Sequence, residues 1–366
     1  MRPLRIAFDG RALTSPAGGV RRYVQELFDA IHLVAPEMAV TAIGAEPSAR
    51  LPSGVRRVPG GASLPTNLGW SLTGLPLGFR RVSCDVFHAP AYTAPLWGAR
   101  PLVVTVHDVS YARHPEWYPY RVDPIRRSFY RASARRADRL LTDSSFSRDE
   151  IVAAFAIDSD RIDVVPLAVS ALFTPDHTIA REPFVLHVGD LHPRRNLSML
   201  LDAVLTLRCT TPACAELRLV LAGSDRGLRE SLTRQANGAA DALVHVGTPA
   251  DSELIDLYRR AAVFAYPSRY EGFGLPPLEA MACGTPVLAS TAGSVPEVVG
   301  SAALLLAADD GHGWREAMHR ILTDKAYAAE LGARGTERAS QFTWERTALG
   351  TIGCYERAAA RRRAEA

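Results

Sequence analysis

Two glutamates, Glu271 and Glu279, carry the clearest chemical signal in the chain. They flank the sequence Gly-Phe-Gly-Leu-Pro-Pro-Leu, and an apolar run that ends at Ala265 predicts a buried strand just before them. The prolines at 276–277 and the glycine at 284 are typical of the start and the end of a short helix. We therefore expect Glu271 in a loop ahead of this helix and Glu279 in its first turn.

The segment between the two acids is suited to a phosphate. Gly272-Phe273-Gly274 lets the backbone come close to a ligand, because glycine has no Cβ. The helix start that follows offers unpaired N–H groups and the positive end of the helix dipole. Carboxylates beside an anion need a further reason, and sugar hydroxyls, which donate hydrogen bonds to them, supply one. The pattern indicates a sugar nucleotide; two solvated acids on a surface turn are the alternative.

A second stretch, residues 188–197, reads Val-Gly-Asp-Leu-His-Pro-Arg-Arg-Asn-Leu. It predicts a strand, a loop that carries Arg194 and Arg195, and a helix capped by Asn196. Two guanidinium groups at the carboxyl end of a strand can hold a diphosphate through charge-assisted, bidentate bonds. The alternative is a surface pair in an arginine-rich chain, in which Lys325 is the only lysine.

Glycines follow the first predicted strand, in the sequence Ser15-Pro-Ala-Gly-Gly-Val20. Gly18 and Gly19 could close over a diphosphate or a sugar. The spacing is not that of a dinucleotide-binding GxGxxG loop, and no acid stands where such a loop requires one for the ribose. A tight turn between strand and helix, which often uses glycine, is the alternative.

Two histidines stand at predicted strand ends, where a side chain can reach a ligand. His107 precedes Asp108 after the apolar run Val-Val-Thr-Val, and His88 ends another apolar run. Both can instead be structural. A His-Asp doublet is also found in metal-dependent phosphohydrolases, but no further His/Asp set at helical spacing supports a metal site.

A basic helix is predicted over residues 120–141. It could rest on anionic lipid or receive an anionic acceptor, and a solvated face is the alternative. Its arginines are Arg121, Arg126, Arg127, Arg131, Arg135, Arg136 and Arg139, against the acids Asp123 and Asp138.

Size and composition restrict the function classes. The length of 366 residues predicts two domains, at about 150 residues each. A net charge of +3 does not favour nucleic acid as a partner. Five cysteines without CxxC spacing indicate neither a disulfide framework nor a zinc site. Because neither a signal peptide nor an apolar run of about 18 residues is found, we expect a cytoplasmic protein whose membrane contact is at most peripheral, at the inner face.

Short apolar strands alternate with amphipathic helical segments, which predicts an α/β architecture with parallel sheets. In the first half the predicted strands are Arg5–Asp9, Val86–His88, Leu102–His107 and Arg139–Asp143, with a helix over Val20–Val34. In the second half they are Phe184–Gly189, Leu217–Gly223, Val244–Gly247 and Ala262–Tyr266.

The pattern restarts after a stretch without a clear period, residues 166–182, which we interpret as a linker. We expect an N-terminal domain over residues 1–170 and a C-terminal domain over residues 171–345. A terminal helix over residues 346–366 is expected to pack back on the N-terminal domain. Ligands of open α/β sheets lie beyond the carboxyl ends of the strands, so both domains are expected to face a central cleft.

The residues around the two glutamates resemble a known signature. Glu271-Gly-Phe-Gly-Leu-Pro-Pro-Leu-Glu-Ala-Met-Ala-Cys-Gly-Thr-Pro is similar to the EGFGLPxLEAMAxGxPV motif of the retaining glycosyltransferases of family 4, which have the GT-B fold of two Rossmann-like domains. Further stretches over nearly the whole chain resemble the same family: Ile6–Arg11 with Gly18-Gly19, Thr105–Asp108, Asp143–Ser147, Gly189–Asn196 and Ser294–Glu297. The N-terminal stretches are most similar to bacterial mannosyltransferases that use GDP-mannose.

The resemblance implies a role for each matched residue. Glu279 would bind the ribose hydroxyls, Glu271 the donor sugar, and His107 the sugar ring near the reacting carbon. Arg194 and Arg195 would hold the diphosphate. The implied catalytic residues are Glu271, His107, Arg194 and Arg195, and the implied substrate-binding residues are Gly18, Gly19, Gly272, Phe273, Gly274, Leu275 and Glu279.

Two positions depart from the family pattern. The family usually has Arg-Lys-Asn where this chain has Arg194-Arg195-Asn196, which preserves the positive charge. Asp190 stands where many relatives have Arg or Thr. An acid near a diphosphate is unfavourable unless it points away or pairs with an arginine, so its role is open.

The implied reaction moves a hexose from a nucleotide diphosphate sugar, GDP-linked or else UDP-linked, to an acceptor hydroxyl with retention. No metal or other cofactor is expected, because arginines can neutralise the diphosphate. Front-face attack and double displacement through Glu271 both stay open. The acceptor, whether glycan, lipid-linked or small molecule, would bind the N-terminal domain, in which loops such as 59–73 and 89–100 carry no recognisable motif. A sugar-nucleotide epimerase and a non-catalytic sugar-nucleotide-binding subunit are the alternative functions.

Overall fold

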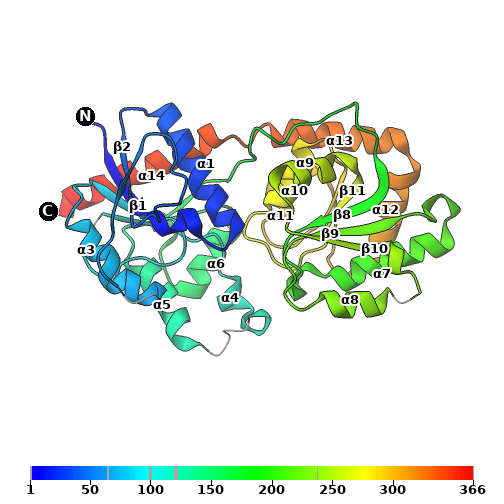
Figure 1. Ribbon diagram of the computed structural model, residues 1–366, viewed down its shortest axis with the longest axis horizontal. Coiled ribbons are helices and arrows are strands. Elements are labelled where there is room, and N and C mark those ends of the chain that lie inside the picture. The colour runs from blue at the N-terminus through cyan, green and yellow to red at the C-terminus, as the bar shows by residue number, and fades with distance from the viewer. Residues whose placement is uncertain (1, 64–65, 99–100, 119–122, 237, 366) are drawn as a thin grey trace. The chain divides into compact units, whose positions relative to one another are not determined.

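The computed structural model describes residues 2–63, 66–98, 101–118, 123–236 and 238–365 (Figure 1). They form two compact units. Unit 1 comprises Met1–Ala168 with Thr343–Ala366, and unit 2 comprises Val169–Phe342. The predicted domain boundaries lie within a few residues of these limits. Among the described residues, no helix is long and apolar enough to cross a membrane.

Unit 1 is an α/β domain with a parallel sheet. In its described part, seven strands follow the order β3-β2-β1-β4-β5-β6-β7. The strands are β1 (Arg5–Asp9), β2 (Ala39–Ile43), β3 (Val55–Val58), β4 (Val86–Ala89), β5 (Leu102–Thr105), β6 (Arg139–Thr142) and β7 (Ile162–Val164). The α-helices are α1 (Gly18–Val34), α2 (Asn67–Gly69), α3 (Leu75–Phe79), α4 (Ser110–Arg113), α5 (Pro124–Arg136), α6 (Ser145–Phe155) and α14 (Trp344–Glu365).

Unit 2 repeats the same plan. Six parallel strands in its described part follow the order β10-β9-β8-β11-β12-β13. They are β8 (Glu182–Val188), β9 (Arg218–Ala222), β10 (Leu243–Gly247), β11 (Ala261–Tyr266), β12 (Val287–Ser290) and β13 (Leu304–Leu306). The α-helices are α7 (Leu197–Thr210), α8 (Arg229–Gln235), α9 (Asp251–Arg260), α10 (Leu275–Ala282), α11 (Val295–Val299), α12 (Gly311–Thr323) and α13 (Lys325–Ala339).

The central strands are buried on both faces, which explains why they are apolar runs and not alternating patterns. Every residue of β4 and β5 is buried. In unit 2, β11 is buried except at its second residue. Each sheet reverses its strand order once, between β1 and β4 in unit 1 and between β8 and β11 in unit 2. These are the topological switch points at which α/β domains bind ligands.

All eight strands predicted from the sequence are confirmed, to within about two residues at each end. Five others were not identified. Three of them, β3, β7 and β13, lie at sheet edges, and their side chains are mostly only partly buried. Such strands need few apolar residues, so their sequence signal is weak. The inner strands β2 and β12 are also short, with five and four residues.

The basic helix predicted over residues 120–141 is shorter than expected. Residues 119–122, which include Arg121, lie outside the described part. Helix α5 ends at Arg136 because Ala137 leaves helical geometry, with ψ of 139°. Arg139 instead begins β6 and pairs with Asp163 at its neighbour β7. This arginine therefore holds two strands together and is not part of a helical face.

The C-terminal helix α14 belongs to unit 1. It packs against α1 and against β4, β5 and β6 (Figure 1). The Tyr355 hydroxyl lies 2.9 Å from His88 Nδ1, and Arg362 pairs with Asp138 at 2.9 Å. The two ends of the chain thus share one core.

Candidate active site

The switch point of unit 2 brings two sequence motifs together. Strands β8 and β11 are direct neighbours, with Leu186 opposite Phe264. The loop after β8 carries Arg194 and Arg195, and the loop after β11 carries Glu271. Residues far apart in the sequence therefore meet at the carboxyl edge of one sheet.

Glu271 is a buried carboxylate held by two guanidinium groups. Arg195 Nη1 donates to Glu271 Oε1, and Arg194 Nη2 lies 3.8 Å from Glu271 Oε2. Arg195 Nη1 also contacts the Tyr266 hydroxyl and, at 3.2 Å, Ser268 Oγ. Burial alone would raise the pKa of Glu271, but the two arginines and the hydrogen bonds of Ser268 and Tyr266 hold it below its ordinary value. Glu271 is therefore an anion at neutral pH.

The loop after Glu271 is fixed by close backbone packing. Ser294 Oγ lies 3.0 Å from the Glu271 carbonyl oxygen and 2.8 Å from that of Phe273. A Cβ at Gly293 would lie 2.6 Å from the Glu271 carbonyl oxygen, so only glycine fits there. Gly274, with φ of 108°, ends the loop in a conformation that favours glycine and caps α10. Both Gly272 and Phe273 are buried in this turn.

Glu279 lies in the second turn of α10, and the expectation of a first-turn position was wrong. The helix begins at Leu275 because Gly274, ahead of the prolines, supplies the cap. Glu279 is buried, and the Tyr258 hydroxyl donates to its Oε2 at 2.8 Å. Burial, and then the charge of Glu279, raises the pKa of Tyr258 well above its ordinary value, so this hydroxyl stays a donor.

Asn196 stands at the N-cap of α7, as predicted, but its side chain does not cap the helix. Its φ of 55° lies in the left-handed region, and Asn196 Nδ2 donates to the Ala308 carbonyl oxygen at 2.6 Å. The side chain therefore ties the arginine-bearing loop to the segment after β13.

In unit 1, His107 is held by a carboxylate that the sequence did not single out. Its Nδ1 lies 2.8 Å from Asp143 Oδ2, and the Tyr23 ring packs edge-on at 4.9 Å between centroids. Burial alone would lower the pKa of His107, but Asp143, Asp108 and the Pro90 carbonyl raise it above its ordinary value. Because Nδ1 is engaged by Asp143, Nε2 is the nitrogen left to act on a ligand.

His88 is a core residue, so its role is structural and it is not a ligand-contacting residue. It is fully buried in β4, with Nε2 at 2.8 Å from Thr105 Oγ1 and Nδ1 at 2.9 Å from the Tyr355 hydroxyl. Burial, with a smaller effect of His107, lowers the pKa of His88 to about 3. A neutral ring inside a hydrogen-bond network is not available to a substrate.

Gly18 and Gly19 are the first two residues of helix α1, which therefore starts two residues before the predicted Val20. Both are exposed, and a Cβ built on Gly19 meets no atom within 4 Å. The protein itself thus places no steric demand on glycine at this position.

Family comparisons match both halves of the chain. The family described as Glycosyltransferase Family 4 matches residues 17–171, and the one described as Glycosyl transferases group 1 matches residues 182–324. The O-antigen chain mannosyltransferase B of Escherichia coli is 35% identical over 286 residues, which cover 74% of each chain. The chain belongs to the family 4 glycosyltransferases. An MMP alpha-(1->4)-mannosyltransferase of Mycolicibacterium hassiacum is 36% identical over 280 residues, or 71% of this chain and 66% of that protein.

Solved structures give the fold. The sucrose-phosphate synthase of Thermosynechococcus elongatus superposes with a TM-score of 0.74 at 23% identity, covering 96% of this chain and 98% of that one. Both units of this glycosyltransferase are Rossmann-like, and the fold is GT-B, as the resemblance implied. The central cleft between the units stays a prediction.

Asp190, whose role the sequence left open, forms an ion pair in this glycosyltransferase. Arg226 Nε donates to Asp190 Oδ2 at 2.9 Å, and both side chains are largely exposed. The acid follows β8 and so lies near the arginine loop, but its charge is offset by a partner.

Sequence reasoning missed three residues that support the candidate site: Asp143, Tyr266 and Ser268. Asp143 follows β6 and lies in a stretch that resembles the family, but the sequence assigned it no role. The pairing of His107 with Asp143 could have been predicted from strand order. Strands β5 and β6 are parallel neighbours, so their carboxyl ends meet at one edge of the sheet. The described residues hold no group of three or more His, Cys, Asp or Glu side chains that could bind a metal.

A cavity of about 520 Å³ opens at the switch point of the unit 1 sheet. Asp9, from the end of β1, and Pro90, directly after β4, both line it. Its other lining residues are Arg11, Ala12, Thr14, Ser15, Pro16, Ala17, Val20, Glu46, Thr66, Asn67, Ala91, Tyr92, Thr93 and Tyr130. They come in part from loops 59–73 and 89–100, which carry no recognisable sequence motif and whose residues 64–65 and 99–100 lie outside the described part. Tyr92 has a φ of 46°, an uncommon conformation for a non-glycine residue that often marks a functional site.

Proposed function

We propose that this glycosyltransferase moves a hexose, mannose foremost, from a GDP-sugar to an acceptor hydroxyl and retains the anomeric configuration. The observation that carries the proposal is the buried cluster of Glu271, Arg194 and Arg195 at the switch point of unit 2. The two relatives named above are both mannosyltransferases by name, which favours mannose as the sugar. A UDP-sugar is the next donor to test.

Charge development explains what the cluster would do. When the bond to the sugar breaks, negative charge grows on the departing diphosphate. Arg194 and the N–H groups at the start of α10 would stabilise that charge, and each such preorganised donor contributes about 3 kcal/mol. Glu271, an anion held in place by Arg195, would accept hydrogen bonds from the sugar hydroxyls.

The ion pair between Glu271 and Arg195 also affects the choice between front-face attack and double displacement. A carboxylate whose pKa is lowered by a buried guanidinium is a poorer nucleophile than a solvated one. We therefore favour front-face attack, in which the acceptor oxygen bonds to the anomeric carbon on the face that the diphosphate leaves. The acceptor proton then passes to the departing phosphate oxygen. Because arginines and helix N–H groups provide the positive charge, we propose that no metal is required.

The acceptor hydroxyl would be presented from unit 1. We propose the cavity lined by Asp9, Asn67 and Tyr92 as the acceptor site. Its polar side chains suit the hydroxyls of a glycan end. His107, held by Asp143, would contact the donor sugar near the reacting carbon.

A donor and acceptor panel tests the proposal. Purified protein is incubated with GDP-mannose, GDP-glucose, UDP-glucose or ADP-glucose and with glycan acceptors, with and without EDTA. Nucleotide release and product are measured, and the anomeric configuration is read by NMR. We expect an α-linked product from GDP-mannose that EDTA does not reduce. An isomerised sugar nucleotide formed without acceptor would indicate an epimerase, and nucleotide binding without turnover would indicate a binding subunit.

A further inference from the structure

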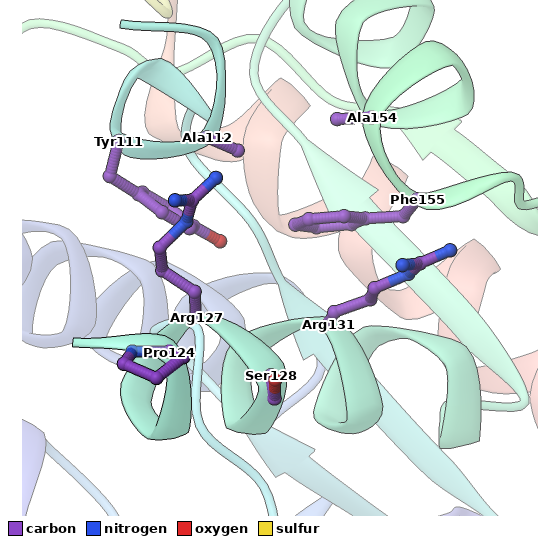
Figure 2. Close-up of a pocket in the computed structure, with 8 residues that line it drawn as sticks. All are labelled: Tyr111, Ala112, Pro124, Arg127, Ser128, Arg131, Ala154 and Phe155. Atoms are coloured by element: carbon purple, nitrogen blue, oxygen red, sulfur yellow. The ribbon is translucent and has the colours of Figure 1, made fainter. Parts of the chain in front are cut away.

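A second cavity of unit 1 lies between α4, α5 and α6 (Figure 2). Its volume is about 250 Å³. Figure 2 shows the Arg127 side chain extending from α5 toward the Tyr111 ring and the Arg131 side chain running below Phe155. The remaining lining residues are Ala112, Pro124, Ser128 and Ala154. None of its described lining residues carries a carboxylate.

Arg127 and Arg131 differ from the other arginines of α5. Arg126 pairs with Asp123 at 3.5 Å, Arg135 Nε donates to the Phe155 carbonyl oxygen at 2.8 Å, and Arg136 is also engaged. Among the described residues, the guanidinium group of neither Arg127 nor Arg131 has a hydrogen-bond or ion-pair partner. The two unpartnered guanidinium groups of this helix are thus the two that line the cavity.

Their spacing places like charges together. Arg127 and Arg131 are four residues apart, so they lie on one face of α5, where equal charges repel. The helix contains no Asp or Glu that could offset them. An anion between the two groups would convert this repulsion into charge-assisted hydrogen bonds, and two guanidinium groups match the oxygens of a phosphate.

The floor of the cavity is apolar. Tyr111 and Phe155 are 5% and 3% exposed, and Ala112 and Ala154 are partly buried beside them. Ser128 adds one hydroxyl. Because the protein already covers these rings, they shape the cavity, and its specificity for a ligand comes from the two guanidinium groups.

The cavity adjoins the acceptor cavity through a cluster of three tyrosines. Tyr111 lines the arginine cavity, and Tyr92 and Tyr130 line the acceptor cavity. Tyr111 packs against Tyr130 at 5.1 Å and against Tyr92 at 5.9 Å between ring centroids. One acceptor molecule can therefore contact both sides of this cluster.

We propose that Arg127 and Arg131 bind a phosphate group of the acceptor, so that the acceptor is a phosphate-bearing glycan. This inference rests on the proposed function, whose acceptor it defines. A glycosyl phosphate or diphosphate, free or attached to a lipid, has the required chemistry.

Binding of a sugar phosphate tests the site. The affinities for mannose 1-phosphate and for methyl mannoside are measured by calorimetry, with GDP at saturation so that the nucleotide site is filled. We expect the phosphate to strengthen binding, and Arg127→Gln/Arg131→Gln to weaken binding of the phosphate by about tenfold or more, since hydrogen bonds to charged groups are strong. Raising the salt concentration should weaken the binding to the unchanged protein.

The matched control is Arg56→Gln/Arg80→Gln, which removes the same charge from two exposed arginines of unit 1 that line neither cavity. Equal affinities of the two double variants for mannose 1-phosphate would overturn the inference. Binding of the unchanged protein to anionic phosphatidylglycerol vesicles, lost in Arg127→Gln/Arg131→Gln, without binding of the sugar phosphate, would overturn it in favour of a membrane contact.

The proposed function fails separately from this site. Failure of transfer to every acceptor in the panel, with GDP still bound, would refute the transferase proposal without affecting the phosphate measurement. Conversely, efficient transfer to neutral glycans, with no gain in kcat/KM for their phosphorylated forms, would overturn the inference and leave the transferase intact.

Discussion

Glu271 and Arg195 depend on each other more than the sequence motif implied. Arg195 is 8% exposed and Glu271 is 5% exposed, and their side chains are in direct contact. Burying each charge alone would cost several kcal/mol, so the pair is stable only as a pair. Mutation of Glu271 therefore acts on the fold as well as on the substrate.

Comparison of Glu271→Ala with Glu279→Ala separates these effects. Glu271→Ala leaves a buried guanidinium unpaired, and we expect a loss of about 3–5 kcal/mol in unfolding free energy together with most of the turnover. Glu279→Ala removes a carboxylate that is not paired with a buried guanidinium in the contacts given above and leaves the Tyr258 hydroxyl without its acceptor, so we expect a loss of about 1–3 kcal/mol in unfolding free energy and weaker nucleotide binding. Urea unfolding, kcat and the Kd of the nucleotide are measured. Equal, small effects of the two variants would contradict the assignment.

Asp143 offers a test of His107. In Asp143→Asn the neutral amide no longer favours the charged ring, so the pKa of His107 should fall. NMR titration of the His107 ring measures that shift directly. We expect kcat to fall about tenfold or more, since one charge-assisted hydrogen bond is worth about 1.5–3 kcal/mol. Asp149→Asn, at an exposed ion pair on α6, is the control, and an unmoved His107 titration in Asp143→Asn would count against the positioning role.

At the scale of elements, the fold requires glycine at the start of α10 but not at the start of α1. Gly274 has room for a side chain but a φ of 108°, so its backbone requires glycine. Gly19 has both room and helical geometry, and nothing in the folded protein explains its identity. A ligand that approaches Gly19 closely would explain it.

Alanine at each position tests this difference. Gly274→Ala should lower the unfolding free energy by about 1–2 kcal/mol, because alanine is strained at positive φ. Gly19→Ala should raise it by about 0.5–1 kcal/mol, because alanine favours the helix. If Gly19 closes over the donor, Gly19→Ala should also raise the KM for the donor. A stabilised variant with unchanged donor KM would remove Gly19 from the site.

For the whole molecule, each unit contains a buried neutral histidine. His88 in unit 1 and His187 in unit 2 are both fully buried, and burial lowers the pKa of each to about 3. Unfolding exposes them and returns the pKa to about 6.5. Below pH 6.5 the unfolded chain therefore binds more protons, and stability is lost as the pH falls toward 3.

We predict that the protein is acid-labile in this window. Each histidine should contribute a loss of about 1.4 kcal/mol in unfolding free energy per pH unit below pH 6.5. Urea unfolding between pH 7.5 and pH 5 measures the slope. His88→Gln should flatten it, whereas His177→Gln, at an exposed position, should leave it unchanged. An unaltered slope in His88→Gln would show that this ring does not carry the effect.

Local patterns were sufficient for most of the fold. Apolar runs such as Leu102–Thr105 identified the buried strands, since strands buried on both faces need side chains of one kind. Prolines and glycines located α10, because they act through their own backbone. The two glutamates and the two arginines were also recognisable from the sequence, because the charge of a side chain follows from its residue type.

Pairing was decided only by the tertiary structure. Arg195 was expected to face a diphosphate, and in the fold it is the partner of Glu271, since neighbouring strands bring the two loops together. His107 Nδ1 is paired with Asp143, which lies far along the chain, because β5 and β6 end side by side. Residue type is local and can be read from a sequence. The partner of a buried charge depends on strand order, which is a property of the whole sheet.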